Sequence, residues 1–239
     1  MTSRVIAIDG PAGSGKSTTA KAVARELDLA HIDSGALYRA VTLVALDAGV
    51  PILDDGDRVV ETAKGKGVEL RDVGSSFRPI VAGVDVSKEI RSARVTEHVS
   101  QVSALPAVRT WVTAALQEAV AQHPRGAVAD GRDIGTVVFP DAVLKIYLTA
   151  AVAERARRRA LEQGMDGATP DIQQLSRDLQ RRDEFDSNRA VSPLRPAADA
   201  IHIDTRIWRS RNKWLPWSSE PGTTSPSLTH IRPGSSLLG

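Results

Sequence analysis

A glycine-rich segment near the N-terminus has the residue types and spacing of a phosphate-binding loop. Its residues, Gly10-Pro11-Ala12-Gly13-Ser14-Gly15-Lys16-Ser17, fit G-x-x-x-x-G-K-[ST] in full, and Thr18 follows directly. Glycines let successive backbone N–H groups turn inward around phosphate oxygens, and a following helix adds its positive N-terminal end. Lys16 would place a cation against the β- and γ-phosphates, and the Ser17 hydroxyl can ligate Mg²⁺. The segment therefore predicts binding of a nucleoside triphosphate with Mg²⁺.

This loop is shared by GTPases, ATPases and small-molecule kinases, so other segments must distinguish them. A GTPase should also carry N-K-x-D, and the nearest match, Asn212-Lys213-Trp214-Leu215, lacks the aspartate. A helicase-type or transport ATPase has an apolar strand that ends in Asp-Glu, whereas Asp130 is followed by glycine. The sequence therefore favours a kinase over either class.

Three further segments combine arginine with glycine or aspartate: Asp33–Arg39, Asp130–Gly135 and Arg182–Arg189. Arg39 lies about one turn into a predicted helix, close enough to reach a dianionic phosphate. The second segment follows a buried strand, at the sheet edge where parallel-sheet ligands bind. Enzymes of phosphoryl transfer mainly position phosphates and neutralise their charge. Arginines converging near the phosphate loop therefore suit a kinase whose acceptor is itself anionic.

Arg155 and Arg159 are four residues apart on one face of another predicted helix. They could contact ATP, and we include them among the candidate ATP-binding residues. They could equally form a solvated helix face, as charged helix faces commonly do.

The elements that must position these residues alternate between short apolar runs and helical patterns. Val5–Ile8 predicts a strand buried on both faces, and Ser34 is the predicted N-cap of the second helix. The predicted helices are 16–27, 35–48, 93–105, 107–122, 151–163 and 171–184. Further parallel strands are predicted at 127–129, 143–148 and 200–203, and antiparallel strands at 68–70 and 80–86. This alternation predicts a doubly wound α/β sheet with an antiparallel insertion.

The composition is that of an ordinary globular protein of 239 residues, 41% hydrophobic and 25% charged. The chain has no cysteine, which excludes disulfides, thiolate metal sites and cysteine nucleophiles. The apolar run Val5–Ile8 is too short for a signal peptide or a membrane helix, so we expect a cytoplasmic protein without a membrane partner. With a net charge of +2 and no basic stripe, we expect no nucleic-acid partner.

Five segments of the chain together resemble bacterial cytidylate kinase. They are Gly10–Ser17, Asp33–Arg39, Ser100–Val102, Ala129–Pro140 and Asn188–Leu194. The resemblance spans about residues 4–205, and its Asp-Gly-Arg-Asp block at 130–133 is specific to that family among nucleotide kinases. It implies a central parallel five-stranded sheet flanked by helices, with a core at about 1–56 and 92–205. It also implies an antiparallel monophosphate-binding subdomain at about 57–91 and a helical lid at about 155–190.

The same resemblance implies phosphoryl transfer from ATP to CMP or dCMP in pyrimidine nucleotide metabolism. It implies that an arginine triad, Arg39, Arg132 and Arg189, holds the acceptor phosphate. Arg182 then lies near the transferring group, and Lys16, Arg132, Arg182 and Arg189 are the catalytic residues. Asp130 would contribute to the Mg²⁺ site through a water molecule.

For the acceptor nucleoside, the resemblance implies that Ser100, Arg109 and Asp133 read the cytosine edge and that Asp186 binds the sugar hydroxyls. Ser34, Tyr38 and Gly131 complete the predicted acceptor site. A hydroxyl or carboxylate can accept from the cytosine amino group, so UMP, with a carbonyl there, should be the weaker acceptor.

Two alternatives stay open at this point: a kinase for another small acceptor such as UMP or shikimate, and a non-catalytic nucleotide- or nucleic-acid-binding protein. We expect a monomer. The chain departs from the family after Thr205, where an amphipathic helix is replaced by a Trp-, Ser- and Pro-rich tail, 206–239. We expect this tail to be disordered or loosely docked, and the uncovered sheet face to expose apolar surface.

Overall fold

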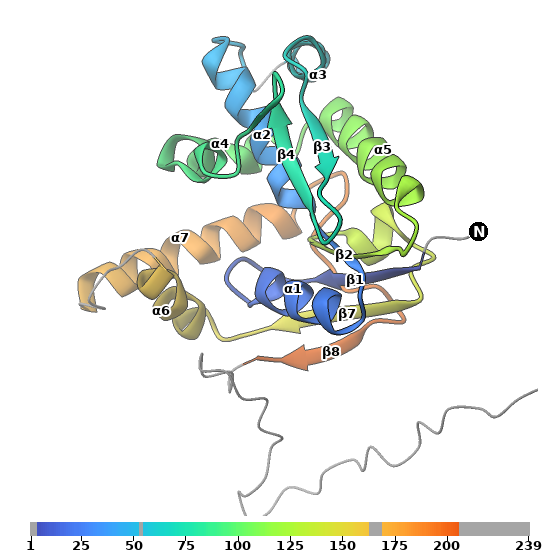
Figure 1. Cartoon of the computed structure of the whole chain (residues 1–239). Coiled ribbons are helices and arrows are strands. Elements are labelled where there is room, and N and C mark those ends of the chain that lie inside the picture. Colours follow the sequence, from blue (N-terminus) through green and yellow to red (C-terminus); the bar gives the residue numbers. More distant parts are fainter. Residues whose placement is uncertain (1–3, 53–54, 163–168, 206–239) are drawn as a thin grey trace, which may run out of the picture. The chain divides into compact units, whose positions relative to one another are not determined.

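A five-stranded parallel sheet forms the centre of the fold in the computed structural model, which describes residues 4–52, 55–162 and 169–205. Its strand order is β2-β6-β1-β7-β8 (Figure 1). The strands are β1 (Val5–Asp9), β2 (Ala30–Asp33), β6 (Ala127–Gly131), β7 (Leu144–Thr149) and β8 (Ile201–Asp204). Every residue of β1 and β6 is buried. The predicted five-stranded parallel sheet is confirmed.

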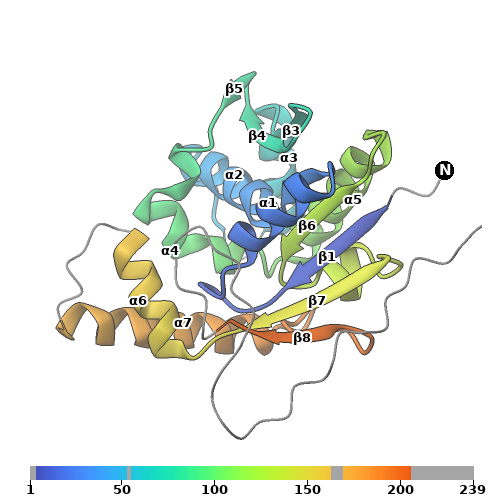
Figure 2. The same cartoon turned by 60° about the horizontal axis from the view of Figure 1, so that its bottom comes forward.

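Helices cover both faces of this sheet (Figure 2). On one face, Ile6 and Ile8 form an apolar cluster with Ala20 and Ala24 of α1 (Lys16–Glu26). On the other face, alternate residues such as Val5 and Ala7 join the larger core with α2 (Ser34–Asp47) and α5 (Pro106–Gln122). This alternation follows from the two-residue period of a strand, and burial on both faces explains the continuous apolar runs in the sequence.

An inserted three-stranded antiparallel sheet lies between α2 and the short helix α4 (Ala93–Val102). It consists of β3 (Glu69–Asp72), β4 (Phe77–Val81) and β5 (Val84–Asp85), after α3 (Gly56–Gly65) and before the 3-10 turn η1 (Glu89–Arg91). The prediction of short antiparallel strands around the glycines of this segment is confirmed, with β4 and β5 joined at Ala82 and Gly83. Ala82 and Gly83 both have left-handed φ, 49° and 80°, so the chain reverses there as a tight hairpin.

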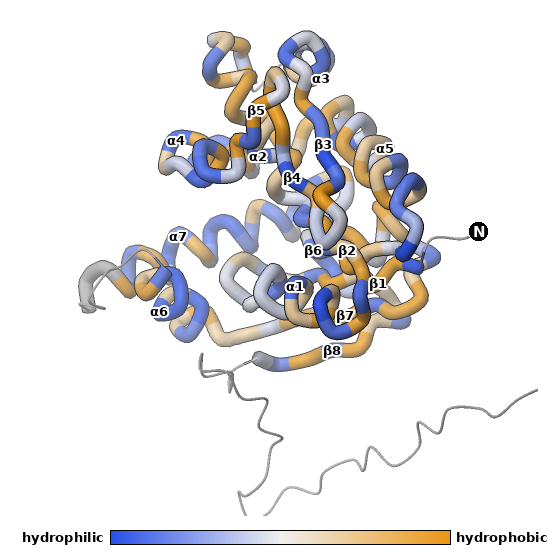
Figure 3. The backbone as a smooth tube through the Cα atoms, in the orientation of Figure 1, coloured by the Kyte–Doolittle hydropathy of each residue, from blue (hydrophilic) through white to orange (hydrophobic). Residues whose placement is uncertain are grey.

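Two helices, α6 (Val152–Glu162) and α7 (Thr169–Ser187), form a pair beside the phosphate loop. Ala156 of α6 and Leu179 of α7 pack on Ala12, so this helical pair has a small apolar core of its own. Figure 3 shows that both helices are mostly hydrophilic, in contrast to the strands of the parallel sheet. None of the helices in the described ranges is long and apolar enough to cross a membrane.

The structure differs from the sequence predictions at several local points. β2, α3 and a π-helix at η2 (Ile134–Val138) were not predicted, because each is short. Ser34 is not the N-cap of α2: the cap is Asp33, whose carboxylate accepts from the backbone N–H of Ala36. β8 is one of the two edge strands, and its Ile201 is 55% exposed, in line with the expected apolar exposure. The predicted tail, 206–239, lies outside the described residues.

Candidate active site

The phosphate loop joins β1 to α1, and close contacts with neighbouring segments hold it in place. Gly10 has φ +149°, and a Cβ atom on it would lie 2.2 Å from the carbonyl oxygen of Leu148, so only glycine fits there. The Lys16 ammonium donates to the carbonyl of Pro11 at 2.8 Å, which folds the side chain back over the loop. Arg132 donates to the carbonyl of Gly10 at 3.2 Å. The loop is therefore held by its own contacts, and a second cation, the guanidinium of Arg132, is bonded to it.

Lys16 is a strongly perturbed lysine. Burial and then repulsion from Arg132 lower its pKa to about 7, although Asp130, Asp9 and Asp33 favour its charged form. A bound triphosphate would replace the lost hydration with negative charge, and so restore the cation. The charge of Lys16 would therefore depend on whether an anionic ligand is bound.

The carboxylate of Asp130, near the end of β6, is held by two side chains on either side of it. Its Oδ2 accepts from the Ser17 hydroxyl at 2.7 Å, and its Oδ1 lies 2.7 Å from Nε2 of His31. Ser17 and Asp130 fit a Mg²⁺ site, because Mg²⁺ prefers oxygen ligands and usually takes only one or two from the protein. Burial and then the charge of Asp130 raise the pKa of neighbouring Asp33.

The second half of the site is a cluster of arginines around one buried carboxylate, Asp186 on α7. Arg132 donates from Nε to Asp186 Oδ2 at 2.9 Å, and Arg189 donates to Oδ1. Burial opposes ionisation of Asp186, but the charges of Arg132, Arg189 and Arg182 outweigh it and hold its pKa below the usual range. The structure thus brings these three predicted arginines together, from two segments about 50 residues apart.

Positive charge exceeds negative charge in this cluster. Burial and then Arg132 lower the pKa of Arg182 to about 9, and burial lowers that of Arg39 to about 10. Arg159 on α6 adds to the repulsion at both. Nε of Arg182 and Nε of Arg189 are buried without a hydrogen-bond partner among the described residues. Buried donors rarely stay unpaired, so the cluster is suited to an anion.

Arg109 and Asp133 form a buried ion pair behind this cluster, each with a side chain 4% exposed. Arg109 also donates to the carbonyl of Ser103 at 2.9 Å and lies over the ring of Tyr38, 5.4 Å from its centroid. Within the described part of the chain, Arg109 Nε and the Tyr38 hydroxyl have no hydrogen-bond partner. Burial raises the pKa of Tyr38 above its usual range, so the phenol stays protonated. The predicted base-reading residues thus leave free polar atoms for a ligand.

Asp9, at the end of β1, was missed by the sequence analysis. Its carboxylate accepts from the backbone N–H groups of Ile134 and Gly135, both at 2.8 Å, and so begins the π-helix. Burial raises its pKa to about 6 despite these two bonds. The sequence did contain a signal for Asp9. It is a charged residue that ends the apolar run of β1, directly before the first glycine of the phosphate loop. Asp9 connects the loop to the segment that carries Arg132 and Asp133.

Close packing also fixes the acceptor segment. A Cβ atom on Gly131 would lie 2.4 Å from the Ser34 hydroxyl, which donates to the carbonyl of Asp130 at 3.0 Å. Ser34 therefore supports the segment from α2. Arg39, one turn further, donates to Thr96 at 2.8 Å and to the carbonyl of Ile90 at 3.2 Å, so two elements hold it.

Arg155 and Arg159 differ in their surroundings. Arg155 is buried, donates to the carbonyls of Ala12 at 2.8 Å and Ala150 at 3.1 Å, and pairs with Asp183 at 2.6 Å. It therefore braces the loop from α6. Arg159 is a third exposed and pairs with Glu162 at 3.2 Å. Their contact with ATP stays a prediction, as do the roles of exposed Thr18 and half-buried Ser100.

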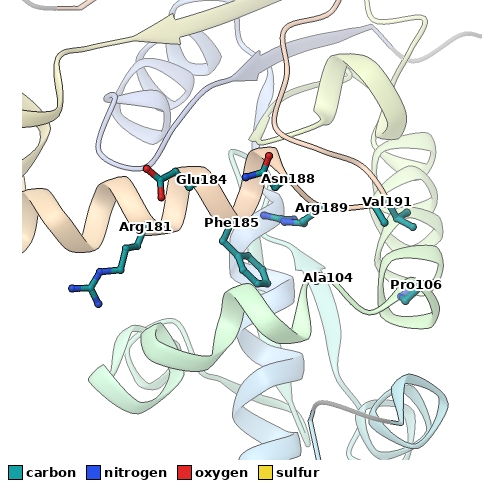
Figure 4. Close-up of a pocket in the computed structure, with 9 residues that line it drawn as sticks. Ala104, Pro106, Arg181, Glu184, Phe185, Asn188, Arg189 and Val191 are labelled. Carbon is teal, nitrogen blue, oxygen red and sulfur yellow. The ribbon is translucent and has the colours of Figure 1, made fainter.

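A cavity of about 560 Å³ opens beside the arginine cluster, between the end of α7 and the turn from α4 to α5 (Figure 4). Among the described residues, Arg189 alone both lines this cavity and belongs to the arginine cluster around Asp186. The cavity is also lined by Arg181, Glu184 and Phe185, which lie on the adjacent face of α7 from Arg182 and Asp186, and by Asn188 directly after the helix. The phosphate loop contributes nothing to its lining.

The fold and the phosphate loop define a P-loop nucleotide-binding protein, in which a cluster of buried arginines is bonded to the loop through Arg132. The family model for cytidylate kinase matches residues 6–210. The chain therefore belongs to the cytidylate kinase family.

Individual relatives agree with the family model. The cytidylate kinase of Desulforamulus reducens is 49% identical over 202 residues, which is 84% of this chain and 89% of that protein. The cytidylate kinase of Mycobacterium avium is 46% identical over 201 residues, covering 84% and 87%. The bifunctional pantoate ligase/cytidylate kinase of Synechococcus sp. (strain JA-3-3Ab) is 46% identical over 204 residues. The chain spans only 37% of that bifunctional protein.

Among solved structures, the shikimate kinase of Bacteroides thetaiotaomicron matches with 15% identity and a TM-score of 0.38, over 78% of this chain and 80% of that one. The fold assignment here rests on the strand order and registers of the chain itself.

Proposed function

We propose that this protein transfers the γ-phosphate of ATP to CMP or dCMP, giving ADP and CDP or dCDP. The observation that carries the proposal is the excess of buried cations near Lys16, where one donor each of Arg182 and Arg189 finds no partner among the described residues. A chain that bound only a triphosphate would have no use for a second cationic pocket. Membership of the cytidylate kinase family supports the same acceptor.

In this proposal, Arg39, Arg132 and Arg189 hold the acceptor phosphate. An oxygen of that phosphate forms the new bond to Pγ while the bond from Pγ to the β-bridging oxygen breaks, and ADP leaves. No general base is required, because the attacking oxygen is already ionised. Lys16 and Arg182 neutralise charge on the transferring group, as the phosphate-site cations of kinases do. Arg132 bonds to both the loop and Asp186, which supports a role between the two phosphates.

Ser100, Arg109 and Asp133 are proposed to read the cytosine edge, with Asp133 accepting from the amino group and Arg109 donating to ring N3 or O2. The burial of Arg109 and Asp133 supports this, since a buried polar site disfavours ligands that leave it unpaired. Tyr38, Ser34 and Gly131 shape the wall of this pocket.

Asp186 is proposed to bind the sugar hydroxyls. Both its oxygens are bonded to arginines in the ligand-free chain, so an acceptor phosphate would have to draw those arginines toward itself.

On the ATP side, residues 10–18 bind the triphosphate, and Arg155 and Arg159 are proposed to contact ATP as the lid closes. Ser17 and Asp130, the latter through a water molecule, would hold Mg²⁺, whose positive charge would offset that of the triphosphate. The Ser17–Asp130 hydrogen bond already brings these two oxygen ligands together.

We further propose that the regions 57–91 and 155–190 move as an acceptor-binding subdomain and a lid on the core, 1–56 and 92–205. Closure would exclude water and suppress ATP hydrolysis. The absence of cysteine and the small size of the chain are consistent with a cytoplasmic monomer.

A coupled assay of ADP formation with CMP, dCMP, UMP, AMP and shikimate tests the proposal on the full chain. We expect turnover with CMP and dCMP, and kcat/KM for UMP at least roughly ten-fold lower. Turnover that prefers shikimate or AMP would contradict the acceptor assignment. ADP release that does not depend on any acceptor would contradict the kinase itself.

A further inference from the structure

His31 is a buried histidine that the mechanism above does not use. It lies on edge strand β2, two residues before Asp33, the register partner of Asp130. Its side chain is 7% exposed and that of Asp130 is 3% exposed. Their hydrogen bond, 2.7 Å from Nε2 to Oδ1, joins β2 to β6 through side chains as well as through the sheet.

This bond divides the two oxygens of Asp130 between two donors. A carboxylate can only accept, so both the histidine Nε2 and the Ser17 hydroxyl donate. With Oδ1 fixed by His31, the carboxylate cannot rotate about its terminal bond, and Oδ2 stays directed at the end of the phosphate loop. We propose that His31 is a positioning residue that sets the orientation of Asp130 for Mg²⁺ bound with the nucleotide. This inference rests on the Mg²⁺ site of the proposed function.

The imidazole ring can be separated from the structural role of β2. The backbone N–H of His31 donates to the carbonyl of Ser75 at 3.0 Å, and His31 forms an isolated parallel β-bridge with Ser76. These backbone contacts dock the inserted sheet on the core. These bonds use the backbone alone, so they are kept when the side chain changes. A change of the ring therefore tests the bond to Asp130 with little effect on strand pairing.

The chain offers a matched control in His123, a second buried histidine of the same region. Among the residues that the structure describes, its Nε2 contacts the carbonyl of Gly74 at 3.2 Å and the carboxylate of Asp72 at 3.7 Å, and its ring packs on Phe77. Removing this ring disturbs a comparable buried site without touching Asp130. A loss common to H31L and H123L would therefore reflect packing, and a loss confined to H31L would reflect Asp130.

The experiment measures Mn²⁺ binding to the complex of the full chain with a non-hydrolysable ATP analogue, by the electron paramagnetic resonance signal of free Mn²⁺. Outer partners of metal ligands are typically worth about 10–100-fold in affinity, so H31L should weaken Mn²⁺ binding roughly ten-fold. H31Q, whose amide nitrogen lies near the place of Nε2, should stay within about two-fold, and H123L should match the wild type. Analogue binding in EDTA should be equal in all four proteins.

Unchanged Mn²⁺ affinity in H31L would overturn the inference, and so would equal weakening in H31Q. If H31L does not fold, H31N replaces it, because its shorter side chain withdraws the donor from Asp130, and the same weakening is expected. The proposed function fails separately: a wild type that binds Mn²⁺ with the ATP analogue but shows no CMP-dependent turnover contradicts the kinase and leaves the role of His31 standing.

Discussion

The two phosphate sites that we propose for this protein are built in opposite ways. The ATP side is one continuous segment, residues 10–18, whose backbone makes the anion cradle and whose one essential cation is Lys16. The acceptor side takes its arginines from α2, from the segment after β6, and from the end of α7 and the residues that follow it. It makes its site from side-chain charge, held in place by Asp186.

This difference has a physical consequence for the ligand-free state. A backbone cradle is neutral and can stay empty, because its N–H groups belong to a rigid loop. Several buried guanidinium groups repel one another: burial first, and then the charges of neighbouring arginines, lower the pKa values of Arg39 and Arg182. Asp186 acts as an internal counter-anion that an acceptor phosphate would supplement. The acceptor side should therefore be the more sensitive of the two to single charge changes.

The most damaging single change should be Arg132→Met, because Arg132 is bonded to both sites. We expect kcat/KM for CMP to fall by roughly 10³-fold or more, the scale of a transition-state arginine. The coupled assay measures this, with Arg181→Met as control, since Arg181 is 71% exposed on the adjacent face of α7. An equal loss in both variants would contradict a bridging role.

Asp133→Ala should remove discrimination at the base while leaving the phosphates in place. We expect the kcat/KM ratio of CMP to UMP to fall by roughly 100-fold, because the carboxylate that accepts from the amino group is lost. The change also leaves Arg109 buried without its partner, at a cost of about 3–5 kcal/mol in the free energy of unfolding. Thermal melting should separate this loss from the change in selectivity. Unchanged selectivity would contradict base reading by Asp133.

Arg189→Gln should affect only the acceptor side. One charge-assisted hydrogen bond is worth about 1.5–3 kcal/mol, so KM for CMP should rise roughly 10–100-fold. The dissociation constant of ATP, from calorimetry, should stay the same. If ATP binding weakened in parallel, the two sites would not be separable as the comparison requires.

A smaller effect is expected from pH on the ATP side. The pKa of Lys16 is lowered to about 7 in the free protein, so the lysine is largely neutral at pH 8. Bound phosphates favour the cation, and ATP binding should therefore take up a proton above pH 7. By linkage, the dissociation constant of ATP should rise about five-fold from pH 7 to pH 8.

Calorimetry in buffers of different ionisation enthalpy measures the proton uptake directly. Lys16→Met should bind ATP weakly with no such pH dependence. A wild type whose ATP affinity is flat between pH 7 and pH 8 would show that Lys16 keeps its charge without ligand.

The same contrast explains what the sequence could and could not predict. The phosphate loop was predictable because its residues are contiguous and each position has a local reason. The parallel sheet was predictable because β1 and β6 are buried on both faces and read as apolar runs. β2 escaped prediction because four residues containing a histidine, Ala30–Asp33, carry too weak a pattern.

The sequence also could not predict hydrogen bonds between residues that lie far apart along the chain. The motif indicated that Arg132 and Asp186 both belong to the site, but not that they bond to each other across 54 positions. Asp9 and His31 were missed for the same reason: each is a polar residue in a strand whose partner lies about a hundred residues away. Asp33 took the cap expected of Ser34 because Ser34 bonds to the neighbouring strand instead.

The central claim is that the two sites face each other at one fixed separation, with Lys16 and Arg132 between them. A cytidine and an adenosine joined by five phosphates would occupy both sites at once, and linked ligands gain about 10²–10⁴-fold over either part. Calorimetry should show this compound binding at least roughly 100-fold more tightly than ATP. An affinity no higher than that of ATP would contradict the claim, because only the loop would then be engaged.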